Sequence, residues 1–147
     1  MSAQNFFEDD LLDLIFTNVA APNVGDAGGL QPSVAPGSFF VSLMSALPAE
    51  TVSDQTTNEP TYTPYARQGV VRTVAGWTVA AGLVDNDAAI TYASVTAGST
   101  TVSHFGLGFA VSGVGFLSMV GVLTAPLAVS NGITPEFAAG DLDVTLD

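Results

Sequence analysis

The sequence predicts a mainly β protein, an antiparallel β-sandwich or jelly-roll-like domain with one N-terminal amphipathic helix and an extended arm. From Phe39 onward, short runs rich in valine, threonine and aromatic residues alternate with turn residues, as half-buried strands require. In the first 37 residues, one segment instead has apolar residues at helical spacing, and a Gly/Pro-rich stretch follows it. A chain of 147 residues can bury a real core without disulfides, and it has no cysteine. We therefore expect two parts, 1–37 and 38–147.

The N-terminal helix is predicted from Ser2 to about Val19. Ser2 or Asn5 can cap its start, and three early acids lie where the helix macrodipole favours negative charge. Its apolar residues recur at i, i+4, i+7 and i+8, which predicts one buried stripe. The stripe consists of Phe7, Leu11, Leu14 and Ile15. The stretch from Ala20 to Ser38 has no period and is expected to be an extended arm or loop.

The expected strands follow from the alternating pattern and from the turn residues between them. They are Phe39–Leu43, Ala66–Val74, Trp77–Ala80, Ala88–Tyr92, Val102–Phe109, Phe116–Leu123, Leu127–Val129, Glu136–Ala138 and Leu142–Leu146. A tight turn is expected between Val84 and Ala88. The polar stretch Pro48–Pro64 is expected to be a long loop, and loops of that length usually serve a function or contact a partner.

The charge balance excludes several classes of function. Fourteen acids stand against two arginines, a formal net charge of −12, so the chain has almost nothing with which to displace counterions from nucleic acid. Binding to an anionic membrane is equally unexpected. The acidic N-terminus does not resemble a secretory leader, and the uncharged run Phe105–Pro135 has too many glycines to predict a membrane helix.

The low content of charged residues points instead to association with other subunits. Charged residues are 11% of the chain and apolar residues 48%, whereas about a quarter of an ordinary soluble domain is charged. Much of the surface is therefore expected to be buried against other copies or a partner.

No motif predicts catalysis, a cofactor or a metal site. His104 is the only histidine, and a Ser-His-Asp hydrolase would need a nucleophile elbow that the sequence lacks. Asp85-Asn86-Asp87 resembles the start of a calcium loop without its glycine and final glutamate, so a turn is the simpler interpretation. Asp141 and Asp143 would share one strand face, either as two solvated charges, as ligands of a cation, or as an acid and a base.

The two arginines are scarce enough to be informative. Arg67 and Arg72 differ by an odd number, so on one regular strand they would point to opposite faces. Each can pair with a carboxylate of this chain or of a neighbour. The simpler alternative is an exposed pair that contributes little to stability.

A series of short motifs follows in order over most of the chain. They are Phe7-Glu-Asp-Asp-Leu-Leu12, Phe40-Val-Ser-Leu43, Asn58-Glu59, Tyr62-Thr-Pro-Tyr-Ala-Arg67, Trp77, Ala89-Ile-Thr91, Val102-Ser-His-Phe-Gly106, Leu127-Ala-Val, Gly132 and Phe137-Ala-Ala-Gly-Asp-Leu-Asp-Val144. These motifs and their order resemble a family of tailed-bacteriophage virion proteins, usually labelled tail fibre or structural proteins, although Pro64 stands where that family has glycine.

This resemblance implies a non-enzymatic virion component, made in the host cytoplasm. We expect a capsid decoration (cement) protein, a homotrimer on the outside of the major capsid protein lattice, away from packaged DNA. A tail or tail-fibre component that contacts the host is the alternative, and a glycan-binding or hydrolytic module is a more distant one. Interface residues are expected on the helix and around the arginines. They are Phe6, Phe7, Leu11, Leu14, Ile15, Tyr65, Arg67 and Arg72.

Overall fold

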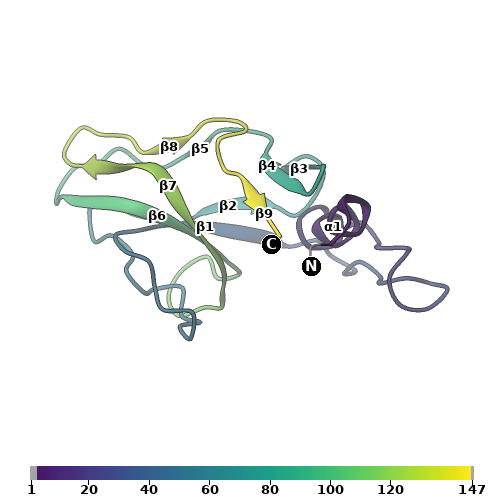
Figure 1. The fold of residues 1–147 in the computed structure, drawn as a ribbon. Coiled ribbons are helices and arrows are strands. Elements are labelled where there is room, and N and C mark those ends of the chain that lie inside the picture. Colours follow the sequence, from purple (N-terminus) through teal and green to yellow (C-terminus); the bar gives the residue numbers. More distant parts are fainter. Residues whose placement is uncertain (1–2, 147) are drawn as a thin grey trace. The chain divides into compact units, whose positions relative to one another are not determined.

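The computed structural model describes residues 3–146 and divides the chain into two compact units. Unit 1 comprises the described residues of Met1–Ser38, Val71–Ile90 and Phe137–Asp147, and unit 2 comprises Phe39–Val70 and Thr91–Glu136. The segment before residue 38 thus shares its unit with two later segments. In chain order the elements are α1 (Asn5–Leu12), η1 (Asp13–Thr17), β1 (Ser38–Met44), β2 (Gln68–Val71), β3 (Trp77–Ala80), β4 (Leu83–Asn86), β5 (Ile90–Thr91), β6 (Thr100–Gly108), β7 (Leu117–Val129), β8 (Glu136–Phe137) and β9 (Val144–Thr145) (Figure 1).

The predicted fold class is confirmed: the chain is mainly β, with antiparallel pairing, an N-terminal helix and an arrangement compatible with a β-sandwich. In unit 2 the strands lie in the order β2-β1-β6-β7, with β1 and β7 flanking β6 (Figure 1). The register places Leu43 opposite Phe105, and β1 is almost entirely buried. Two bulges interrupt the β6–β7 pairing, and β7 forms one edge of the sheet.

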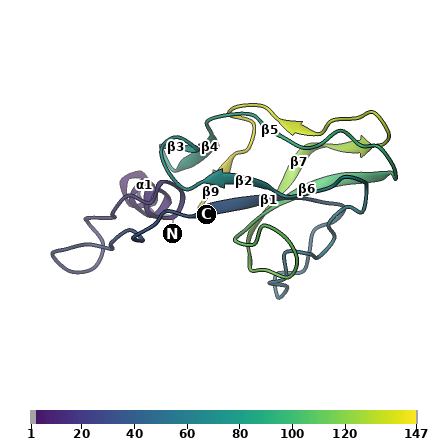
Figure 2. The same cartoon turned by 180° about the vertical axis from the view of Figure 1, so that it is seen from behind.

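Two long connections extend from this sheet, one between β1 and β2 and the other between β6 and β7 (Figure 2). They meet where the backbone N–H of Gln55 donates to the Gly115 carbonyl at 2.8 Å and where Asp54 forms a β-bridge with Phe116. The long loop predicted at Pro48–Pro64 is therefore present, and it is tied to the β6–β7 connection.

The helix of unit 1 is shorter than predicted and changes type midway. It starts at Asn5, and its N-cap Gln4 makes no side-chain capping bond, while Ser2 lies outside the described residues. After Leu12 it becomes π-helical and ends at Asn18, which has a left-handed conformation with φ of 57°. The longer π-helical turn shifts the faces of the helix relative to an ordinary 3.6-residue period.

The predicted stripe of this helix is only partly buried, since Leu11, Leu14 and Ile15 are half-buried and the fully buried residues lie beside them. Leu12 and Phe16 are fully buried, whereas Phe7 is 37% exposed. The Phe16 ring meets Trp77 of β3 edge-on, with ring centroids 5.0 Å apart. Packing against that hairpin, rather than the spacing of apolar residues, decides which face is buried.

The turn predicted between Val84 and Ala88 is also wrong, since Leu83–Asn86 is strand β4. The chain reverses at Ala81 and Gly82, which both have positive φ, and Ala80 pairs with Leu83. Two left-handed residues between paired strands are the geometry of a type I′ hairpin. Asn86 is buried, and its amide donates to Ala88 and Ala138 at 2.8 Å each.

The remaining differences concern lengths and the arm. The predicted strand Ala66–Val74 shortens to β2, and the two predicted strands from Phe116 to Val129 are one strand, β7. The Gly/Pro-rich arm folds back as a loop closed by a bridge between Ala21 and Leu30. Asn18 holds that loop through reciprocal side-chain bonds with the Ser33 backbone, 2.8 and 2.9 Å long. Among residues 3–146, no helix has the length and apolar character needed to cross a membrane.

Candidate subunit interface

The centre of unit 2 holds a buried ion pair that braces the β6–β7 connection. Arg67 donates from Nε and Nη2 to the two carboxylate oxygens of Glu59, at 2.8 and 2.9 Å. The same guanidinium donates to the carbonyls of Ala110 and Gly113, at 2.8 Å each. The Arg67 side chain is 2% exposed and that of Glu59 14%, so the interpretation of Arg67 as an exposed residue is wrong. The hydrogen bonds that Arg67 donates to the Glu59 carboxylate raise the pKa of Arg67.

Tyr65 completes this network from the β1 side. Its hydroxyl donates to Glu59 Oε1 at 2.8 Å and accepts a bond from the Leu43 amide at 3.1 Å. Burial raises the pKa of Tyr65, and the negative charge of Glu59 raises it further, so the phenol stays protonated. Its ring lies edge-on to Tyr62 and stacks on Tyr92. These tyrosines are therefore core anchors of unit 2.

Gln55 fastens the same two connections and was not singled out by the sequence. Its side chain is fully buried, donates to the Phe40 carbonyl at 2.8 Å and accepts from the Ala110 amide at 3.3 Å. A Cβ at Gly108 would overlap the Gln55 amide, so glycine is required beside it. A glutamine in a polar loop gives no sequence signal. Its role depends on contacts 55 residues apart along the chain.

The connection braced by these residues presents an apolar surface, called here the 109–116 tip. Its large apolar side chains are much exposed: Phe109 48%, Val111 63%, Val114 81% and Phe116 59%. The rings of Phe109 and Phe116 stack with centroids 6.3 Å apart. Arg67 and Gln55 hold the backbone beneath, so the exposed side chains project from an ordered loop. Exposed apolar clusters of this kind mark interaction sites.

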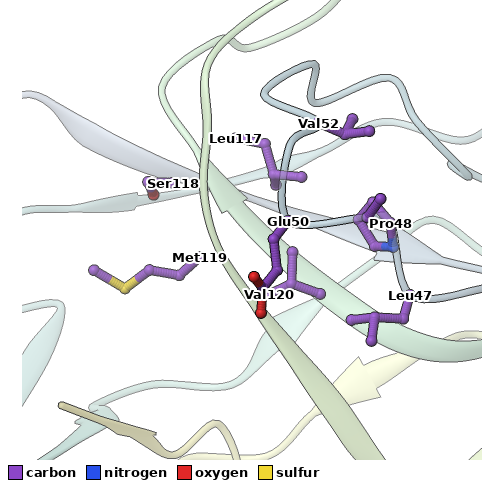
Figure 3. Close-up of a pocket in the computed structure, with 9 residues that line it drawn as sticks. Leu47, Pro48, Glu50, Val52, Leu117, Ser118, Met119 and Val120 are labelled. Carbon is purple, nitrogen blue, oxygen red and sulfur yellow. The ribbon is translucent and has the colours of Figure 1, made fainter. Parts of the chain in front are cut away.

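Next to the tip lies an apolar groove between the β1–β2 loop and the edge strand β7. Its volume is about 360 Å³, within the range of pockets that take a ligand or a few side chains. Leu47, Pro48 and Val52 stand on the loop side, and Leu117 and Val120 on the β7 side (Figure 3). The groove is completed by Ala49, Glu50, Ser118 and Met119. Glu50 carries the only formal charge in its lining.

The two units differ sharply in charge. Ten of the 14 acids lie in unit 1 and four in unit 2, with one arginine in each. In unit 2 the pairing of Glu59 with Arg67 leaves Glu50, Asp54 and Glu136 as the other carboxylates. The chain from Ala88 to Pro135, which includes the tip, has no acidic residue, lysine or arginine. Unit 2, with a formal net charge of −3 against −9 for unit 1, is thus the less anionic part of the chain.

The structure separates the expected interface residues between the units. Tyr65 and Arg67 meet at Glu59 in the interior of unit 2. In unit 1, Arg72 donates to the carbonyls of Leu14, Ile15 and Pro36 and so caps the end of the helical segment. Phe6 is 63% exposed and Leu11 is half-buried.

The residues considered for chemistry are placed as follows. The Ser103 hydroxyl donates to the Ser45 carbonyl at 3.0 Å and lies 2.8 Å from His104 Nδ1, which anchors the imidazole beside β1. Asp141 accepts from the Ala138 amide in a turn, so it does not share a strand face with Asp143. Within residues 3–146, no three acidic, histidine or cysteine side chains gather as a metal site.

Asp143 is instead a neighbour of Asp85 on β4. Burial raises the pKa of Asp85, and the hydrogen bond to Asp143 and the negative charge of Asp143 raise it further. Two carboxyls in contact hold a proton more tightly than either would alone. The pair therefore makes the stability of unit 1 depend on pH.

A family model described as podophage GP4 fiber I protein gp80 matches residues 2–145, nearly the whole chain. No curated protein matches the sequence.

Proposed function

We propose, from the premise that the chain belongs to the family of podophage GP4 fiber I protein gp80, that it is a non-enzymatic building block of a fibre on the virion. Membership of this family makes it a structural protein of a tailed-phage virion, as the resemblance in its sequence predicted. The description of the family is what supports the placement in a fibre.

The single observation that carries a mechanical role is the ordered, uncharged tip of unit 2. Four large apolar side chains there are between 48% and 81% exposed, on a loop that a buried ion pair holds from below. Exposure of such a surface to water is unfavourable, and its burial stabilises the assembly by about 25 cal/mol per Å² of apolar area. A structural subunit uses such a surface to bind its neighbours.

The distribution of charge fits the same role. Unit 1, with ten of the 14 acids, is suited to solvent and repels anionic surfaces. Unit 2 carries fewer charges, and its uncharged 109–116 tip is suited to burial in an assembly. A part of the particle that faces outward, away from packaged DNA, requires no basic residues.

Capsid decoration is the second placement that we propose, and the low content of charged residues, 11% of the chain, favours it. A homotrimer on the lattice of the major capsid protein would bury apolar surface and resist the pressure of packaged DNA. The chemistry of the tip serves either placement, because both require burial against other virion subunits.

The two placements are distinguished by location and copy number on purified particles. Antibody labelling followed by electron microscopy should mark appendages if the chain builds a fibre, and the whole head if it decorates the capsid. Hundreds of copies per particle indicate decoration, and a small multiple of the fibre number indicates a fibre. Absence of the protein from purified particles would contradict both.

A glycan-binding or hydrolytic module is tested separately. His104→Ala should leave the particle and any glycan or ester turnover unchanged. Loss of a measurable turnover in a folded His104→Ala protein would contradict a purely structural role.

A further inference from the structure

We infer that the groove between the β1–β2 loop and β7 receives the 109–116 tip of a second copy of this chain. The inference deepens the proposed function and rests on it, since it names the surface through which the building blocks bind one another. It places the apolar residues Val111 and Val114 of one copy against Leu47, Pro48 and Val120 of the next.

The tip has the properties of the inserted partner. Val111 and Val114, at 63% and 81% exposure, project most into solvent. Arg67 holds the Ala110 and Gly113 carbonyls at 2.8 Å, so the loop is ordered before it binds. An ordered loop loses less conformational entropy on binding than a flexible one.

The groove has the properties of the receiving site. At about 360 Å³ it has room for a few side chains of a partner, and seven of its nine lining residues are apolar. One of its walls is β7, which lies at the edge of its sheet and has no charged residue. Natural proteins usually protect exposed edges with charges, so an uncharged edge favours contact with another chain.

The distribution of charge supports a second copy of this chain as the occupant of the groove. A chain with a formal net charge of −12 is repelled by its own copies wherever acids face one another. The tip carries no charge and the groove only Glu50, so two copies can meet there with little repulsion. Because each copy carries both the tip and the groove, a copy satisfies both surfaces at once.

The experiment compares three purified full-length variants with the unchanged protein by sedimentation velocity over a range of concentrations. Val114→Asp alters the tip and Leu47→Asp the groove. Val34→Asp, in unit 1, is the control, because it adds the same charge at a fully exposed position. All three positions are at least 64% exposed, so folding should be unaffected, and the far-ultraviolet circular dichroism should be unchanged.

The unchanged protein and Val34→Asp should form the same oligomer, with dissociation constants within about threefold of each other. Val114→Asp and Leu47→Asp should each raise the dissociation constant at least about 100-fold, because each would bury an unpaired carboxylate.

Three results would overturn the inference: a monomeric unchanged protein, self-association unaffected by Val114→Asp and Leu47→Asp, or self-association weakened by only one of these two variants. A monomer that still attaches to particles would leave the proposed function in place and show that the tip binds a different virion protein. A dimer supports reciprocal insertion, and a trimer supports a closed ring of the same contact.

Discussion

Replacing Arg67 tests how strongly the buried ion pair holds the tip. Arg67→Met removes two hydrogen bonds to Glu59 and one each to Ala110 and Gly113, all 2.8 to 2.9 Å long. It leaves the largely buried Glu59 carboxylate without its cation. Removal of one partner of a buried ion pair costs about 3–5 kcal/mol.

For a chain of this size, that loss lowers the unfolding temperature by roughly 6–20 °C, at about 2–4 °C per kcal/mol. The unfolding temperature of Arg67→Lys should lie between those of the unchanged protein and Arg67→Met, because an ammonium group lacks the planar fork that reaches Glu59 and two carbonyls together. The assays are calorimetric unfolding and the rate at which chymotrypsin cleaves beside Phe109 and Phe116. Cleavage there should accelerate in both variants, because the loop loses its support.

The reasoning would be refuted if Arg67→Met lost less than about 1 kcal/mol, the value of an exposed pair. A double variant, Glu59→Leu/Arg67→Met, gives a further test. It should be more stable than Arg67→Met alone, because it leaves no unpaired buried charge.

Three other predictions follow from single residues. The pKa of Asp85 is raised above its ordinary 3.8, so the stabilisation that the protonated pair gives is present at low pH and is lost as the pH rises through the raised value. At pH 7 Asp85→Asn should therefore unfold at a higher temperature than the unchanged protein. An equal pH dependence of the unfolding temperature in Asp85→Asn and in the unchanged protein would contradict this. Gly108→Ala should cost about 2–4 kcal/mol in chemical denaturation, because the new methyl group displaces the buried Gln55 amide from its bonds; an unchanged midpoint would show that Gln55 is not held there. Asn18→Gly keeps the left-handed conformation but loses both bonds to Ser33, so proteolysis between residues 19 and 34 should accelerate, whereas a rate equal to that of the unchanged protein would show that the arm is held elsewhere.

The fold class was predictable because strand-forming residues and turns alternate along the chain. Trp77–Ala80 was predicted with its observed bounds, and Phe39–Leu43 to within one residue at each end. Strand β4 was missed because Asp85-Asn86-Asp87 has the composition of a turn, although the reversal occurs at Ala81-Gly82. The I′ geometry there depends on backbone conformation more than on composition.

The candidate site was predictable only in part. The scarcity of arginine correctly drew attention to Arg67, but the sequence could not show that its carboxylate is Glu59 or that it holds carbonyls 43 and 46 residues away. The lack of charged residues from Ala88 to Pro135 was visible in the sequence. That this stretch forms an ordered tip beside a groove depends on long-range contacts of Gln55, which no local pattern encodes.

The most direct test of the account follows the protein into the particle. The phage that encodes this chain is propagated with the unchanged protein, with Val114→Asp or with Val34→Asp, and copies per purified virion are counted by quantitative mass spectrometry. Val34→Asp should be incorporated at the unchanged copy number and Val114→Asp at a small fraction of it. Equal incorporation of the two variants would contradict assembly through the 109–116 tip of unit 2.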